Sequence, residues 1–359
     1  MSQMSNAAFK EARRLVQDLF QPKPWVYWTD FLVTMVVAYS AAISFIKIPN
    51  QPVPLAVGLY LIAIVGLYRL SLFIHEISHL GKRAVPGFTT AWNILVGIPN
   101  LLPSFFYETH REHHNTHHFG TKHDGEYLPL ASGRWSDVLA FLAQIFYLPL
   151  LTFVRHLIVT PLSFLHPGLR RWTLEHWSSF VINLSYRREI RPNDPVHWWA
   201  VVEIGCHLRA VLLLVLVVVG IDPWHAPFFI YLLAVGTLTM NHVRTMAAHR
   251  YRSDGQSMSL QEQMLDSTDI QARDPLTLAM CPVGLRFHAL HHLFPGIPYH
   301  NLETAHRRLM QALPAEHPYR SCVYPSLWSA IGELFEEFFK RRAERKESNS
   351  EPDRWQHAA

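Results

Sequence analysis

Four long apolar segments constrain the fold of this chain more than any other feature. They occupy residues 26–46, 53–74, 199–220 and 224–243. A helix of about 20 apolar residues crosses the hydrocarbon core of a bilayer. Charged residues make up only 17% of the 359 positions, which suits a protein with much of its surface in lipid. The sequence therefore predicts an all-α integral membrane protein whose four transmembrane helices form two hairpins.

Two further apolar stretches do not fit simple crossings. Residues 138–165 contain Pro149, Arg155 and His156, and residues 92–106 are short and interrupted by prolines. If 138–165 crossed the membrane once, the histidine-rich segments before and after it would lie on opposite sides. We therefore expect 138–165 to lie in the membrane interface or to re-enter, with an ordinary fifth span as the alternative. We expect residues 92–106 to be re-entrant.

The distribution of basic residues predicts which side faces the cytoplasm. Four crossings place both termini on one side, and the loops on the opposite side hold Lys47 alone among Lys and Arg. Because cytoplasmic loops are enriched in Lys and Arg, the termini are expected to be cytoplasmic. We expect 1–25 to form an amphipathic cytosolic segment, 26–320 the membrane domain and 321–359 a charged helix and tail. The basic residues on the terminal side are Lys82, Arg83, Arg170, Arg171, Arg187, Arg188, Arg191, Arg244, Arg250 and Arg252.

Histidines at helical spacing form three clusters among the 23 in the chain. The first lies in "LFIHEISHLG", where two histidines are four residues apart. The second and third each read H-x-x-H-H, a spacing that places three imidazoles on one helix face. Imidazole is the commonest nitrogen ligand of metals in proteins, so the clusters predict a metal centre. The clustered residues are His75, His79, His110, His113, His114, His288, His291 and His292.

The order H-x-x-x-H, H-x-x-H-H, H-x-x-H-H beside paired membrane segments resembles the membrane-bound fatty acid desaturase family over about residues 25–320. The resemblance implies a cytosolic helical cap that holds a non-haem di-iron site, with the clustered histidines as ligands. It implies O2 as co-substrate and the introduction of a double bond into a long-chain acyl lipid. It also implies a separate electron donor of the ferredoxin or cytochrome b5 type, for which a basic cytoplasmic surface is suited. The active site is expected on the cytoplasmic side.

The family often draws one more ligand from the stretch after its last membrane helix, which here contains His242 and His249. The two are seven residues apart and share a helix face. We favour His249 because it lies farther from the apolar segment. His117 and His118 exceed the family pattern, and they are candidates either for ligation or for support of the ligands. The carboxylates and amide that are candidates to orient ligand imidazoles are Glu76, Glu112, Asp124, Glu126 and Asn301.

The histidine clusters leave the reaction open. Hydroxylation of a lipid or an alkane would use the same residues, because the outcome depends on where the substrate carbons lie relative to the irons. His75 to His79 also match the H-E-x-x-H motif of zinc proteases, but such a site needs only one further protein ligand. The number of histidines therefore favours iron. A metal-binding membrane scaffold without turnover is the alternative from another class.

Overall fold

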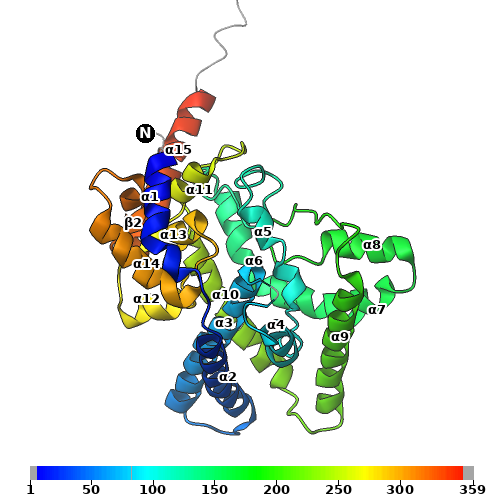
Figure 1. The fold of residues 1–359 in the computed structure, drawn as a ribbon. Helices are drawn as coiled ribbons and strands as arrows, with labels where there is room; N and C mark the ends of the chain where they lie inside the picture. Colours follow the sequence, from blue (N-terminus) through cyan, green and yellow to red (C-terminus); the bar gives the residue numbers. More distant parts are fainter. Residues whose placement is uncertain (1–5, 82, 351–359) are drawn as a thin grey trace, which may run out of the picture.

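The computed structural model describes residues 6–81 and 83–350, and in these residues the chain is mostly helical (Figure 1). Two short strands, β1 (Asp269–Ile270) and β2 (Val323–Tyr324), pair in parallel. The tail predicted after Ser350 lies outside the described residues. Helix is thus the dominant structure, as the sequence predicts.

Five helical runs in the described chain are long and apolar enough to cross a membrane. Only 22–28% of the apolar window of each run is buried inside the protein. The exposed apolar area is far larger than a soluble monomer tolerates, so lipid has to cover it. The chain is therefore an integral membrane protein. The runs are α2 (Pro24–Lys47), α3 (Val53–His79), α6 to α7 (Trp135–Ser163), α9 (Val196–Val218) and α10 (Ala226–Met246).

Small residues allow α2, α3 and α10 to pack closely. A Cβ added at Gly66 of α3 would lie 2.7 Å from the Cβ of Ala38 in α2, so the glycine lets the two backbones approach. Gly236 of α10 faces Tyr60 of α3 in the same way. The Tyr60 hydroxyl also donates to the Leu232 carbonyl at 3.2 Å. These contacts fix α10 against the first hairpin.

The connections of the two hairpins lie together at the end of the molecule far from the histidine clusters. Lys47, at the end of α2, has its Nζ 2.8 Å from Oδ1 of Asp222, which lies between α9 and α10. Both connections are at the bottom of Figure 1, below the short helices α5 (His110–His113) and α13 (His288–Leu293). The two hairpins therefore point in the same direction.

The apolar stretch after the second histidine cluster is one continuous helical run. It consists of α6 (Trp135–Val154), a π-helical turn η4 (Arg155–Val159) and α7 (Thr160–Ser163). Pro149 lies inside α6 without ending it. By length and apolarity this run is a candidate span, in addition to the four predicted from the sequence.

The chain then returns to the histidine end of the molecule. Helix α8 (Pro167–His176) follows the run. After it, the amides of Ile182 and Asn183 donate to the Gly125 carbonyl at 3.0 and 2.9 Å. Gly125 directly follows Asp124, a candidate partner of the ligand histidines. The segments before and after 135–163 thus meet at the same end of the protein.

Residues 88–107 fold into short turns rather than a long helix. They form α4 (Phe88–Trp92), the π-helical turn η2 (Asn93–Gly97) and η3 (Ser104–Tyr107). The Asn93 amide donates to the Ser104 hydroxyl at 2.8 Å and accepts from its backbone N–H at 2.9 Å. These bonds close the segment and direct Tyr107 toward the second histidine cluster.

The remaining elements form a helical cap over the histidine end (Figure 1). In its hydrophobic core Ala12 and Val16 from the N-terminal helix pack with Leu290 and Leu309. This packing holds α13, and therefore the third histidine cluster, in place. The cap comprises α1 (Asn6–Val16), η1 (Gln17–Leu19), α11 (Leu260–Asp266), α12 (Pro275–Met280), α13, α14 (Tyr299–Ala312), η5 (Pro318–Cys322) and α15 (Leu327–Ser350).

Candidate metal centre

Four separate segments bring nine histidines together. His75 and His79 occupy successive turns at the end of α3, and α5 with its C-terminal residue supplies the second cluster. The third cluster lies on α13. His249 follows α10 by three residues, where a β-bridge to Ser267 fixes its backbone.

These histidines divide into two groups. Within each group, the ligand atoms all lie within 4.8 Å of one another. The five-histidine group draws on all three clusters, and the four-histidine group contains residues of the second and third clusters with His249. The five-histidine group is His75, His79, His110, His114 and His291, and the four-histidine group is His113, His249, His288 and His292.

The ring nitrogens in each group converge at the spacing of ligands around one ion. Six pairs of Nε2 atoms lie 2.9–3.2 Å apart, each pair inside one group. Nitrogens about 2.1 Å from a shared ion are about 3.0 Å apart at the corners of an octahedron and about 3.4 Å apart in a tetrahedron. Most of the observed distances are nearer the octahedral value. The five-histidine group, with three distances of 3.0–3.1 Å, therefore fits an ion that takes more than four ligands, and the four-histidine group fits a second ion. Imidazole ligands suit iron.

His75 gives an independent indication that a ligand belongs in the five-histidine group. It is buried, and neither of its ring nitrogens has a hydrogen-bond partner among the described residues. A buried polar atom left in this way costs about 1–3 kcal/mol. Coordination of a metal ion would satisfy one of these nitrogens.

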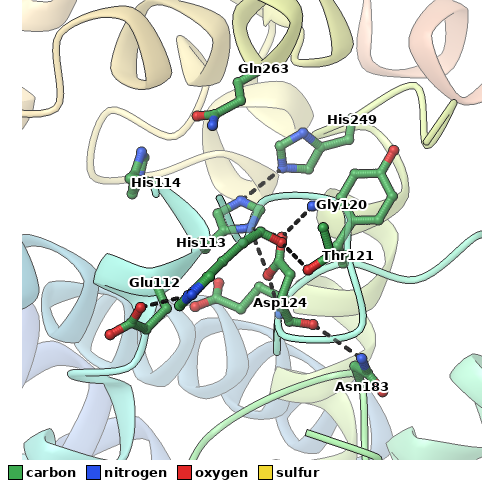
Figure 2. Close-up of polar contacts among 12 residues, drawn as sticks. Glu112, His113, His114, Gly120, Thr121, Asp124, Asn183, His249 and Gln263 are labelled. Carbon is green, nitrogen blue, oxygen red and sulfur yellow. Dashed lines mark hydrogen bonds and ion pairs between the residues drawn. The ribbon is translucent and has the colours of Figure 1, made fainter. Parts of the chain in front are cut away.

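Carboxylates orient two of the imidazoles through their Nδ1 atoms. The Nδ1 of His113 lies 2.9 and 3.0 Å from the two oxygens of Asp124, whose carboxylate is fully buried and also accepts from the Gly120 amide at 3.0 Å (Figure 2). The Nδ1 of His110 lies 2.7 Å from Glu126. When Nδ1–H donates to a carboxylate, the lone pair of Nε2 is free to bind a metal.

The environment keeps most of these imidazoles neutral, as ligation requires. Burial, reinforced by the neighbouring imidazoles, lowers the pKa of five of these histidines well below the usual value. They are His110, His114, His288, His291 and His292. Burial also lowers the pKa of His249, with contributions from His113 and Arg244. Burial is the largest single effect on His113 and would lower its pKa, but the carboxylates of Asp124, Glu126 and Asp266 together outweigh it, so this pKa is raised. Burial raises the pKa of Glu126 to about 7, against the opposing effect of His113.

The other candidate histidines lie outside both groups. The His242 ring packs against Phe141 of α6 at a tilt of 33°, with ring centroids 4.4 Å apart, and its Nδ1 bonds to the Leu238 carbonyl. His117 is exposed. The Nδ1 of His118 lies 2.7 Å from Glu112, which also pairs with Arg191 at 2.6 Å.

Two predicted supporting residues have other partners. Glu76 accepts from the Tyr27 hydroxyl at 2.6 Å and from the Tyr299 amide at 3.2 Å, so it links α3 to α2 and α14. Asn301 donates to the Leu19 carbonyl at 2.8 Å and lies 3.0 Å from His300 Nδ1. Glu76 therefore holds the cap onto the membrane helices, whereas Asn301 joins two elements within the cap.

Arg244 lies beside the histidine groups, a position that the sequence analysis did not predict. From the sequence it was only one of the basic residues expected on the cytoplasmic side. It lies in α10 near the end that leads to His249, and it is only 8% exposed. Its Nε has no hydrogen-bond partner among the described residues. A charged residue inside an apolar helix often has a functional role, so the position of Arg244 in this apolar helix could have indicated it.

Similarity to known proteins agrees with this geometry. The chain matches the fatty acid desaturase family over residues 50–323. It is also 36% identical over 343 residues to a ceramide hydroxylase from Caulobacter vibrioides, a match that covers 93% of this chain and 95% of that protein. The chain therefore belongs to the fatty acid desaturase family, whose members use a non-haem di-iron centre. It is a membrane-embedded oxidoreductase that modifies lipids.

Proposed function

We propose that this protein hydroxylates a ceramide or a closely related long-chain lipid. The observation that carries the proposal is the similarity to a ceramide hydroxylase along nearly the whole chain, combined with the two converging histidine groups. Desaturation is the first expectation from the histidine clusters alone, and this similarity favours hydroxylation over it. In the proposed reaction one O2, two electrons and two protons convert a C–H bond into C–OH and yield one water.

The histidines of the two groups would hold two iron ions. Bound iron would supply the oxidising strength, drawn from O2, that breaks an unactivated C–H bond. The residues around the ligands have positioning roles. Asp124 holds the proton of His113 on Nδ1, and Glu126 does the same for His110 while accepting from the Tyr107 hydroxyl at 2.7 Å.

The proposed membrane arrangement has two crossing hairpins, α2–α3 and α9–α10, with the histidine end in the cytoplasm. In this arrangement residues 135–163 begin and end on the histidine side, either lying in the membrane interface or re-entering, and residues 92–106 re-enter. The bonds from Ile182 and Asn183 to Gly125 support this return. The basic loops at the histidine end support its cytoplasmic orientation.

Electrons would enter from a separate acidic protein at a pocket beside the four-histidine group. The pocket has a volume of about 790 Å³. One wall contains Tyr127, whose ring centroid lies 5.9 Å from that of His249. Four basic residues outnumber two acidic ones, Asp254 and Glu344, in its lining, so its net positive charge suits a ferredoxin or cytochrome b5 with an acidic face. The basic residues that line it are Lys122, Arg134, Arg341 and Arg345.

Lipid analysis after expression in a ceramide-producing host that lacks the activity tests this function. Hydroxylation adds the mass of one oxygen to the ceramide pool, and growth under ¹⁸O2 should place the heavy isotope in the product. Desaturation would instead remove two hydrogens. An iron-loaded protein that leaves every lipid unchanged would refute both reactions. A variant carrying His113→Ala and His291→Ala, which removes one ligand from each group, is the inactive control.

A further inference from the structure

Arg244 is a buried cation, and among the described residues no carboxylate forms an ion pair with it. It lies two residues after His242 on α10, so the two side chains point to different faces of the helix. His242 faces α6, as its contact with the Phe141 ring shows. Arg244 faces the other way, toward α3 and the cap, and its charge acts on Tyr68, Tyr107, Cys281 and Tyr251.

The protein leaves much of the hydrogen-bonding capacity of this guanidinium unused. No carboxylate of the described residues lies within ion-pair distance of it, and its Nε is unpartnered. The Tyr68 hydroxyl can accept one of its N–H groups while donating to the Met280 carbonyl at 3.1 Å, which leaves the other N–H groups, Nε among them, for another acceptor. Burial raises the pKa of Glu126 and the charge of Arg244 opposes this rise, but the two oxygens of this carboxylate already form hydrogen bonds with Tyr107 and His110. A guanidinium has five N–H donors, so this one is able to bind an incoming oxygen.

The neighbours of Arg244 place it beside both histidine groups. The Tyr107 ring stacks on His110 of the five-histidine group, with centroids 4.8 Å apart. The Tyr251 ring lies 5.6 Å from His249 of the four-histidine group, and the Tyr251 hydroxyl donates to the carbonyl of Thr245, the residue after Arg244. An oxygen bound by Arg244 would therefore lie close to the reacting centre.

The depth of the site in the membrane agrees with a polar ligand there. His79 is the last residue of α3, and His249 follows the end of α10. The groups thus lie where apolar helices reach the polar interface, which is also where lipid head groups lie. Carbons next to a lipid's polar group reach this level without the lipid leaving its leaflet.

We propose that Arg244 binds the amide carbonyl or a hydroxyl oxygen of the ceramide and so directs oxidation to a carbon within a few bonds of the polar group. This assignment rests on the proposed function and adds its regiochemistry and one specificity residue. A neutral lipid oxygen suits the site because the fork of N–H donors binds it by hydrogen bonds, without a second buried charge. The distal part of the hydrocarbon chain offers no acceptor for this residue.

The experiment locates the new hydroxyl by tandem mass spectrometry in the products of the full-length protein. Wild type should place it next to the amide or on the first few carbons of the chain. Arg244→Gln, with wild-type iron content, should raise KM for ceramide about tenfold or more, because one hydrogen-bonding partner is lost, and should scatter the hydroxyl position. Arg244→Lys, which keeps the charge without the fork, should retain part of the selectivity. Arg209→Gln, in α9, is the control for loss of an arginine from a membrane helix and should leave both measurements unchanged.

Two results would overturn the assignment. One is a wild-type hydroxyl in the middle or at the far end of the chain, a measurement that does not depend on whether any variant folds. The other is an iron-loaded Arg244→Gln protein with unchanged KM and hydroxyl position. Iron-loaded wild type that produces no hydroxylated ceramide would refute the proposed function itself, and the assignment with it.

Discussion

Replacing Asp124 by Asn should weaken metal binding without removing any ligand. The carboxylate is fully buried and accepts hydrogen bonds from three donors, namely the His113 imidazole, the Gly120 amide and the Glu126 amide. Asparagine keeps the shape but turns one oxygen into an NH2 group, so at least one donor loses its acceptor. The structural cost is about 1–3 kcal/mol. The partner of a ligand imidazole typically contributes about 10–100-fold to metal affinity or activity.

The assay is iron content per chain during titration with a chelator, with thermal unfolding of the same purified samples in detergent. Asp124→Asn should release iron at roughly 10–100-fold lower chelator concentration than wild type. Asp18→Asn is the matched control, since Asp18 forms an exposed ion pair with Arg308 far from the histidines. A variant that holds its iron as tightly as wild type would refute the role of Asp124.

Three further outcomes are expected. His249→Ala should abolish product formation and lower iron content with normal membrane insertion. His242→Ala, which loses its contact with Phe141 and its bond to the Leu238 carbonyl, should keep measurable activity per iron. The reverse result would place the ninth ligand inside α10. Because Cys206, Cys281 and Cys322 are buried, an impermeant maleimide added to intact cells should label Ile221→Cys and leave Gly81→Cys unlabelled; equal labelling of both would contradict the two-hairpin arrangement. Chelation should abolish turnover, and Fe²⁺ but not Zn²⁺ should restore it, because the five-histidine group offers more ligands than a tetrahedral zinc site uses and zinc has no redox chemistry. Zinc-supported turnover would rule out the iron assignment.

The histidine pattern predicted which histidines lie close together, because helical phase is a local property. Residues three and four apart on one helix must share a face, and the structure does bring together His110, His113 and His114 from one short helix. Their division between two groups could not be predicted. His113 belongs with His249, while His110 and His114 belong with His75, and this depends on how four segments meet in space.

The membrane helices were predictable from apolar length, but the behaviour of residues 135–163 was not. Pro149 and Arg155 suggested an interrupted segment, yet the helix continues through both with a π-helical turn. Arg155 is accommodated because it pairs with Glu203 of α9, a contact between residues far apart in sequence. Asn301 shows the same limit: its amide bonds to Leu19 in the cap, which spacing alone could not indicate.

The way α13 serves both groups has a consequence for how the enzyme is assembled. His291 points to the five-histidine group, and His288 and His292 point to the four-histidine group, all from one helix of six residues. The first ion to bind would order this helix and α5. Binding of the second ion would then cost less conformational entropy, because these helices are already ordered. Metallation should therefore be cooperative, and molecules should be mostly empty or fully loaded. At limiting iron, cells would hold fewer complete enzymes rather than many half-filled ones, and so few molecules would carry a lone iron able to react with oxygen unproductively.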